Sequence, residues 1–232
     1  EEIVASAQGN RCRSIAYTYT EPTIFFEYSY DTARVAHEKD LTNIYVTNGF
    51  MTEEMLEKMD PYLAAANVDL KAFRDETYRE YVGARLQPVL DSLKRMKELG
   101  VWVEVTTLVI PDLNDSPGEL REIAEFIAED LGPETPWHIS RFRPAYEMRD
   151  RHPTEVERLM EAQAIGEGAG LRYVYVGNVP GETNTVCHAC GETVIERTGY
   201  RVLDNRTTAD GHCPSCGTAV AGVGLGAGTE SG

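Results

Sequence analysis

Along this chain, short stretches in which every second residue is apolar alternate with longer stretches in which apolar residues recur with helical spacing. In residues 14–20, Ile15, Tyr17 and Tyr19 alternate with smaller or polar neighbours, which predicts a β-strand. In residues 119–132, by contrast, apolar residues recur on one face of a helix. The predicted strands cover residues 14–20, 43–47, 67–73, 101–110, 137–142 and 171–177. The predicted helices cover residues 23–39, 53–63, 88–100 and 119–132, and a last one follows a capping box at Thr154 and Glu157 and runs to Gly170.

Strands that alternate with helices in this way predict right-handed crossovers and a parallel sheet. Six such strands fit either a doubly wound sheet or a barrel. A G-x-G-x-x-G motif does not follow the first strand, which argues against a dinucleotide-binding fold. The sequence therefore predicts an α/β protein with a partial (β/α)6-type, TIM-like barrel. In such a fold the chemistry gathers at the carboxyl edge of the strands.

The residues that follow the predicted strands are polar, while the strand bodies are apolar. They are Thr20-Glu21-Pro22, Thr47-Asn48-Gly49, Asp69-Leu70-Lys71, Pro111-Asp112, Arg141-Phe142-Arg143 and Gly177-Asn178. Each group has a plain structural interpretation: Glu21 caps the following helix, Asn48-Gly49 is only a turn, and Lys71 is solvated. Together, a ring of acids, amides and cations at one end of a barrel is better explained as a binding site.

Composition narrows the class of protein. The chain has 232 residues, a hydrophobic fraction of 42% and a formal charge of −16, from 38 acids against 22 bases. This charge argues against nucleic acid or an anionic membrane as a partner. No apolar run has membrane-spanning length and no secretory leader is visible, so we expect a cytoplasmic protein. The chain starts at Glu1, in what reads as the middle of a helix, and we expect the natural protein to extend upstream.

Four of the five cysteines form two C-x2-C pairs near the carboxyl end. The pairs, Cys187/Cys190 and Cys213/Cys216, are separated by 22 residues that contain a predicted hairpin, and a glycine follows each pair. Four thiolates around one tetrahedral zinc is the favoured interpretation, with disulfides or a second cluster as alternatives. His188 and His212 are interpreted as exposed neighbours of the pairs, and the remaining Cys12 as a small buried residue.

An ordered series of motifs runs along nearly the whole chain, from Glu1 to about Val223. It consists of YTYTEPTIFFEY, VTNGF, NVDLKAF, VWVEVTTLVIPDLND, WHISRFRP, LRYVYVGNVPG, CHAC and CPSCG. This series resembles the radical SAM (S-adenosylmethionine) member of the AmmeMemoRadiSam set, which is similar to the activating enzymes of glycyl-radical enzymes such as pyruvate formate-lyase. The resemblance implies a radical SAM partial barrel over 1–182 and a zinc ribbon over 183–223, and the composition predicts a disordered Gly-rich tail over 224–232.

The resemblance also implies a set of SAM ligands. Thr20-Glu21-Pro22 stands where the family has Gly-Glu-Pro, whose carboxylate receives the ammonium of SAM. The VDLK match implies Asp69 and Lys71 as contacts of the ribose and the methionine carboxylate, and the VTNGF match implies Thr47 and Asn48. Arg143, with Tyr146, matches more loosely a further contact of the methionine.

The reaction implied by the resemblance starts when a reduced [4Fe–4S] cluster passes an electron to SAM. A 5′-deoxyadenosyl radical then abstracts hydrogen from a substrate, with an electron donor and a protein substrate as expected partners. The cluster needs three cysteines as C-x3-C-x2-C, and the chain has no such motif, since Cys12 is its one cysteine before the C-x2-C pairs. We therefore interpret the chain as an N-terminally truncated piece, inactive as it stands, or else as a degenerate relative without the cluster.

Two other classes of function stay open. One is a non-catalytic module, in which the ribbon and the barrel surface dock a partner protein. The other is a cluster-free barrel lyase that uses Lys71 as a Schiff base.

Overall fold

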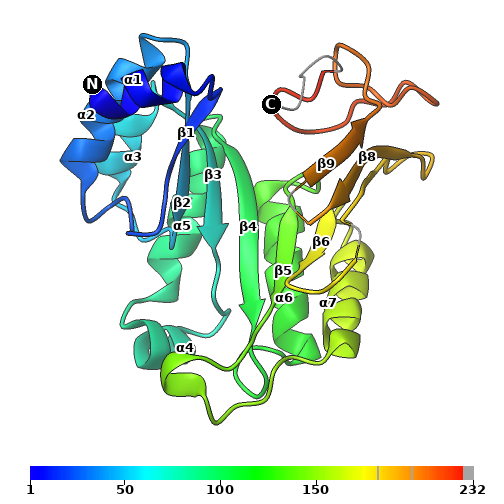
Figure 1. Cartoon of the computed structure of the whole chain (residues 1–232). Helices are drawn as coiled ribbons and strands as arrows, with labels where there is room; N and C mark the ends of the chain where they lie inside the picture. The colour runs from blue at the N-terminus through cyan, green and yellow to red at the C-terminus, as the bar shows by residue number, and fades with distance from the viewer. Residues whose placement is uncertain (182, 200, 227–232) are drawn as a thin grey trace. The chain divides into compact units, whose positions relative to one another are not determined.

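The computed structural model describes residues 1–181, 183–199 and 201–226 (Figure 1). It divides into two compact units, Glu1–Thr107 and Leu108–Gly232. The domain boundaries expected from the sequence remain predictions, and the expected Gly-rich tail, 224–232, lies outside the described residues from position 227 onward. Among the helices of the described ranges, none is long and apolar enough to cross a membrane.

A six-stranded sheet follows the order of the sequence, so that every strand neighbours the next one along the chain. Its strands are β1 (Ser14–Tyr17), β2 (Thr42–Thr47), β3 (Leu63–Asp69), β4 (Trp102–Val109), β5 (Trp137–Arg141) and β6 (Val174–Gly177). The pairs β1–β2, β2–β3, β3–β4 and β5–β6 are parallel. The predicted α/β fold with a parallel sheet is confirmed.

The first unit places its helices between the strands. They are α1 (Glu2–Gly9), α2 (Phe26–His37), α3 (Glu53–Met59), the short α4 (Asp75–Thr77) with a π-helix at Tyr78–Val82, and α5 (Leu86–Glu98). Thr52 is the N-cap of α3, and its hydroxyl accepts a hydrogen bond from the amide of Met55 at 3.2 Å. Helices α1, α2 and α3 lie along the same side of β1 and β2 (Figure 1).

Several predicted elements of the first unit have different bounds in the structure, and the helix predicted over 53–63 ends at Met59. Strand β1 ends at Tyr17 rather than at residue 20, and Tyr19 adopts a φ of 67°, which no strand continues through. Strand β3 covers Leu63–Asp69, whereas residues 67–73 were predicted. Its first half is rich in alanine, which has little strand propensity, so the pattern understated its beginning.

The second unit contains α6 (Pro117–Phe126), continued by a π-helix at Ile127–Leu131, a 3₁₀ turn at Tyr146–Met148 and α7 (Val156–Gly168). Ser116 caps α6 by accepting a hydrogen bond from the amide of Glu119, and Pro117 occupies the first helical position. Helix α7 packs closely on β5 and β6: a Cβ atom at Gly166 would lie 2.9 Å from the ring of Trp137 and 3.1 Å from Val174.

The predicted capping box at Thr154 and Glu157 is wrong. Glu155 precedes α7 and no side chain caps its first turn. The hydroxyl of Thr154 donates instead to the carbonyl of Val109 at 2.6 Å and accepts from the amide of Phe142 at 3.1 Å. Thr154 therefore joins the exits of β4 and β5. Its hydroxyl bonds to these two backbone groups rather than to the first turn of α7, because both groups are buried and need a hydrogen bond.

A separate three-stranded antiparallel sheet lies toward the carboxyl end of the second unit. Its strands are β7 (Thr185–Val186), β8 (Thr193–Thr198) and β9 (Arg201–Asn205). The pairing of β8 with β9 confirms the hairpin predicted between the two C-x2-C pairs. This sheet and the two C-x2-C pairs are called the ribbon below.

Candidate functional site

The side chain of Glu21 bridges the exits of two strands. Glu21 lies in the turn after β1, and its Oε1 accepts a hydrogen bond from the hydroxyl of Thr47 at 2.5 Å. Its Oε2 accepts from the backbone amide of Asn48 at 2.8 Å, and the hydroxyl of Thr23 lies 3.4 Å from Oε1. The carboxylate is thus held at the carboxyl edge of β1 and β2 by groups of the chain itself.

The interpretation of Glu21 as a helix cap is wrong. Helix α2 begins after Phe25, and no side chain accepts a hydrogen bond from its first turn. Residues 21–25 form a turn closed by the amide of Ile24, which donates to the carbonyl of Glu21 at 3.0 Å. The predicted helix start at residue 23 was therefore early, and the glutamate side chain is directed to β2 rather than to the helix.

The turn after β2 needs its glycine. Gly49 has a φ of 74°, and a Cβ atom there would lie 2.7 Å from the side chain of Val68. The amide of Gly49 donates to the hydroxyl of Thr47 at 3.1 Å, and the amide of Phe50 donates to Asn48 Oδ1 at 3.1 Å. The segment is a tight turn, as the plain interpretation has it, and this turn is what presents the amide of Asn48 to Glu21.

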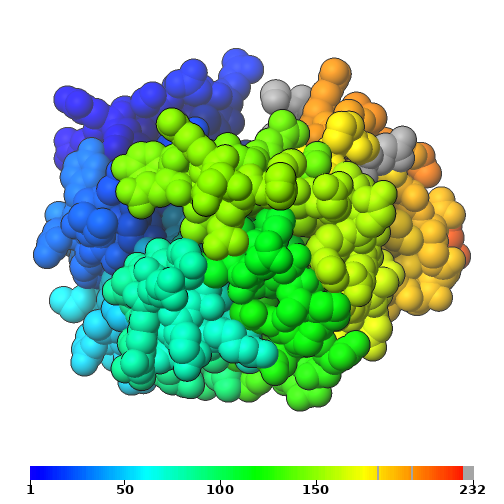
Figure 2. Space-filling view, turned by 90° about the horizontal axis from the view of Figure 1, so that it is seen from below, coloured from blue at the N-terminus to red at the C-terminus, as the bar shows by residue number. Residues whose placement is uncertain are grey.

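An ion pair occupies the exit of β3. Lys71 Nζ lies 2.8 Å from Asp69 Oδ2, and the two side chains are 38% and 41% exposed, so both still reach solvent. Behind them, the amide of Lys71 donates to the hydroxyl of Tyr78 at 3.1 Å. Tyr78 is 1% exposed, and its burial raises its pKa to about 12. The segment formed by α4 and the π-helix that follows it contributes to the surface in Figure 2.

The structure therefore brings together several of the predicted SAM ligands of the first unit. Thr47 pairs with Val68 in the β2–β3 register, so the two strand exits that carry Asn48 and Asp69 are neighbours. Thr20 is exposed and Pro22 is buried. Sequence reasoning missed the support given by Tyr78, because a tyrosine in a helical stretch carries no signal of a bond to a strand exit.

SAM carries an ammonium, a carboxylate and ribose hydroxyls. The carboxylates of Glu21 and Asp69 and the ammonium of Lys71 are complementary to these groups in charge and in hydrogen-bonding type. The residues present fit the cofactor.

Arg143 and Tyr146 belong to the second unit. Arg143 Nη2 lies 3.4 Å from the carbonyl of Asn178, whose side-chain amide donates to the hydroxyl of Ser140 at 2.8 Å. Tyr146 is 83% exposed and has a φ of 52°. Their assignment as methionine contacts remains a prediction.

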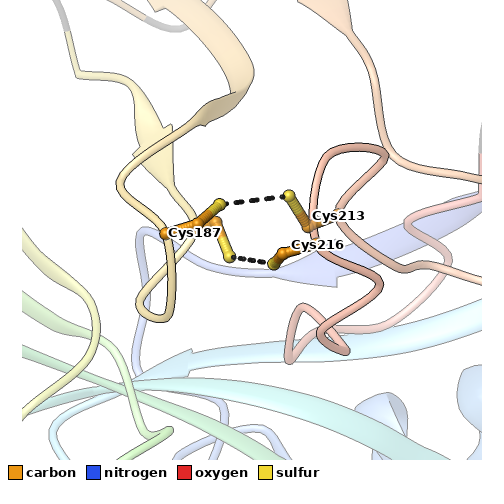
Figure 3. A group of neighbouring side chains, drawn as sticks. Cys187, Cys213 and Cys216 are labelled. Carbon is orange, nitrogen blue, oxygen red and sulfur yellow. Dashed lines mark hydrogen bonds between the residues drawn. The ribbon is translucent and has the colours of Figure 1, made fainter.

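The four cysteines of the ribbon meet at one point (Figure 3). The Sγ atoms of Cys187 and Cys216 are 3.6 Å apart, those of Cys190 and Cys213 are 3.7 Å apart, and all four lie within 4.8 Å of one another. A tetrahedral zinc with Zn–S bonds of about 2.3 Å requires S–S separations of roughly 3.8 Å. The four thiols fit such a metal ion.

The local backbone explains this convergence. Gly191 and Gly217 have φ values of 78° and 73°, and their amides donate to the carbonyls of Cys187 and Cys213, each at 2.9 Å. The hydrogen bonds with Thr218 lower the pKa of Cys216, which favours its thiolate form.

The two histidines beside the pairs do not belong to this group. His188 is exposed, as expected, and its ring contacts that of Tyr173. His212 is half-buried rather than exposed, and its Nδ1 lies 3.2 Å from a carboxylate oxygen of Asp210.

The prediction that Cys12 is buried is wrong. Cys12 is exposed, in the connection from α1 to β1, where Arg11 has a φ of 57°. The five cysteines of the chain therefore consist of one exposed residue and the group of four in the ribbon. This set does not provide the three-cysteine motif of a radical SAM cluster.

Comparison with known proteins identifies the family. The model of the radical SAM superfamily matches residues 1–127. An uncharacterized protein of Methanocaldococcus jannaschii is 41% identical over 223 residues, which make up 95% of this chain and 66% of that relative. The chain thus spans somewhat less than two thirds of the length of this relative.

Solved structures share the fold at low sequence identity. A domain of pyruvate-formate lyase-activating enzyme from Bacteroides vulgatus matches with a TM-score of 0.61 and 16% identity, over 71% of this chain and 99% of that domain. A radical SAM methyltransferase from Sphaerobacter thermophilus matches with a TM-score of 0.60 and 18% identity, over 75% of this chain and 55% of that one. Streptococcus suis SuiB matches with a TM-score of 0.62 and 14% identity, over 76% and 42%. These neighbours confirm the predicted fold, and since the family model covers more than half of the sequence, the chain belongs to the radical SAM superfamily.

Proposed function

We propose that this chain is the SAM-binding part of a radical SAM enzyme of the AmmeMemoRadiSam set, similar to the activating enzymes of glycyl-radical enzymes. The ordered motifs support the set, and membership of the superfamily implies SAM and an iron–sulfur cluster as cofactors. The proposed reaction is reductive cleavage of SAM, followed by hydrogen abstraction from a substrate. An electron donor and a protein substrate remain the expected partners.

The position of Glu21 carries the proposal. A carboxylate offers about four acceptor sites. Thr47 and Asn48 occupy two of them at good distance, and they fix the plane of the group at the edge of the sheet. An ammonium would add a charge-assisted hydrogen bond to a group that is already oriented. Asp69 and Lys71 at the neighbouring exit are proposed to contact the ribose and the methionine carboxylate, and Thr20 and Pro22 to shape the turn.

The cluster does not fit the cysteines of this chain. Cys12 has no cysteine near it in sequence, and the other four are gathered in the ribbon. We therefore derive no step through the cluster from these residues. Its ligands are proposed to lie in a segment of the protein outside these 232 residues, and a C-x3-C-x2-C motif encoded upstream in the gene would establish this.

The test of the SAM site compares Glu21→Gln with Thr47→Val in the protein expressed from its whole gene, by calorimetric titration of SAM. Glutamine removes the charge, whereas valine removes one bond that orients Glu21 and keeps the charge. If Glu21 binds the ammonium, Glu21→Gln should weaken SAM binding by about 1.5–3 kcal/mol, the free energy of a hydrogen bond to a charged group. This corresponds to roughly ten-fold or more in Kd.

The comparison separates a ligand from a positioning group. Under the proposal, Thr47→Val changes the Kd clearly less than Glu21→Gln does. Equal losses in both variants would mean that Glu21 acts only by holding the exit of β2. Unchanged affinity in Glu21→Gln would remove Glu21 from the site.

The ribbon is proposed to hold zinc through Cys187, Cys190, Cys213 and Cys216. The support is the pair of S–S separations, 3.6 and 3.7 Å, which match a tetrahedral thiolate site. The purified chain should carry about one zinc per molecule, and Cys190→Ser should release it while the first unit stays folded. Metal analysis that finds iron in its place, or a folded chain without metal, would contradict this assignment.

A further inference from the structure

The ribbon shares a hydrophobic core with the approach to β6. Tyr173, one residue before that strand, is 3% exposed and packs in one cluster with two of the metal-site cysteines, Cys187 and Cys213. Its hydroxyl also accepts a hydrogen bond from the amide of Ala221 at 3.1 Å. The ribbon is therefore packed on the strand and does not hang from it by a linker.

The face of β5 and β6 on which this packing occurs is the one that α7 does not cover. Helix α7 contacts the rings and methyl groups of Trp137 and Val174 through Gly166. Because side chains alternate along a strand, His138 and Tyr175 point to the opposite face. The two residues are partners in the β5–β6 register, and their rings are stacked, with centroids 5.2 Å apart and planes inclined by 24°.

A continuous series of hydrogen bonds leads from the ribbon to this pair of rings. The hydroxyl of Tyr175 lies 2.9 Å from that of Thr185, which is buried in β7 two residues before Cys187. Arg197, on β8, donates to the same Thr185 hydroxyl at 2.5 Å. The amide of Arg197 donates to Asn184 Oδ1 at 2.8 Å, so β7 and β8 together hold the group that Tyr175 contacts.

We propose that the four-cysteine ribbon positions His138: its metal fixes Thr185 and Arg197, these hold Tyr175, and Tyr175 holds the imidazole on the face that α7 does not cover. The inference rests on the proposed metal site of the ribbon and is independent of SAM binding. It makes Tyr175 a positioning residue and gives the ribbon a role in the barrel, since the half-buried His138 belongs to strand β5.

The metal is needed for this role because the ribbon has little apolar core. Apart from Cys187 and Cys213, its buried cluster contains Val194, Ile195 and Val220, together with Tyr173 from the barrel. Small metal domains of this kind derive much of their folding free energy from the metal. Loss of the metal should loosen β7, and Tyr175 should then lose its contact with the hydroxyl of Thr185.

The experiment observes the stacked rings directly in the full chain by NMR, with His138 assigned through His138→Gln. In the zinc-loaded protein we expect a cross-relaxation signal between the rings of His138 and Tyr175. Removal of the metal by a chelator, verified by metal analysis, should abolish this signal and shift the imidazole resonances. The indole resonance of Trp102, in the first unit, should stay unchanged and so report that this unit is still folded.

A matched pair of variants tests the hydrogen-bonded series with the metal in place. Thr185→Val removes the hydroxyl that links Tyr175 to Arg197, and it should weaken the ring–ring signal without loss of zinc. Thr183→Val is the control, because the Thr183 hydroxyl donates to the carbonyl of Gly199, at 3.3 Å, and not to Tyr175 or Arg197 among the described residues, so the ring–ring signal should persist. If the His138 signal is unchanged after verified zinc loss, or in Thr185→Val, the inference is overturned, but the assignment of the metal site still stands. A chain that binds no metal would overturn both.

Discussion

The replacement of Thr154 by valine tests the connection between the exits of β4 and β5. Valine has nearly the shape of threonine, so Thr154→Val removes the hydroxyl and leaves the packing in place. The side chain is fully buried, and its hydroxyl serves the carbonyl of Val109 and the amide of Phe142. Both backbone groups lose this partner in the variant.

The expected cost follows from these two groups. A buried polar group left without its hydrogen bond costs about 1–3 kcal/mol, so Thr154→Val should lower the free energy of unfolding by roughly 2–5 kcal/mol. The remaining contacts limit the damage, because the amide of Thr154 still donates to Phe142 and Arg141 still donates to the carbonyl of Thr154. A helix cap at Thr154 would instead be worth about 1 kcal/mol, and Glu157 would share in it.

The assay is urea unfolding followed by tryptophan fluorescence in a Trp102→Phe background. The chain has two tryptophans, and this background leaves Trp137, which is buried in the second unit with Thr154. The denaturant slope should stay constant, as it does when only the stability of the native state changes. Thr154→Ser should retain most of the stability, and Glu157→Ala should be nearly neutral. A Thr154→Val cost below about 0.5 kcal/mol, the scatter of ordinary surface changes, would refute the reasoning, and so would an equal cost in Glu157→Ala.

Two further predictions concern stability. Gly166→Ala should lower the free energy of unfolding in urea by about 1–3 kcal/mol, because the new Cβ atom would lie 2.9 Å from the ring of Trp137 and clash with it. Gly168→Ala, in the same helix and with no atom within 4 Å of the new Cβ, should be neutral or stabilising, and a reversed order would contradict the packing of α7. Burial raises the pKa of Tyr78 to about 12 in the native state, whereas an unfolded tyrosine has a pKa near 10, so stability should fall as the pH rises through this interval. Unfolding curves at pH 9 and pH 11 should show a smaller fall for Tyr78→Phe, and equal falls would show that the burial of this hydroxyl contributes nothing.

How well the fold could be predicted varied with the chemistry of each strand. Strand β4 was predicted to within one residue at each end, because its valines and threonines alternate with a clear period of two. Strand β3 was predicted four residues late, since three consecutive alanines follow its first residue, Leu63, and carry no such period. The end of β1 could not be predicted, because it depends on the positive φ of Tyr19, and the residue type tyrosine gives no sign of this conformation.

The candidate sites differ in the same way. The convergence of the four cysteines was predictable because C-x2-C spacing and the following glycine define a local geometry that needs little from the rest of the fold. The location of Glu21 at a strand exit was also visible in the sequence. Its hydrogen bond to the amide of Asn48 was not, because almost every residue type has a backbone N–H and the sequence does not indicate which one donates. Cys12 and Thr154 were interpreted wrongly because burial and partner choice are set by distant segments.

In each C-x2-C pair of the ribbon, the first cysteine is buried and the second is exposed. Cys187 and Cys213 are 2% and 1% exposed, whereas Cys190 and Cys216 are exposed. With the proposed zinc ion bound, a competing ligand or an oxidant that arrives from solvent would meet the thiolates of Cys190 and Cys216 first, while Cys187 and Cys213 would still hold the ion. Metal exchange should accordingly proceed in two stages, a fast and reversible attack at Cys190 and Cys216 and a slow release limited by the opening of the core around Cys187 and Cys213. The ribbon would then survive brief exposure to chelators and oxidants that, at equilibrium, would strip it.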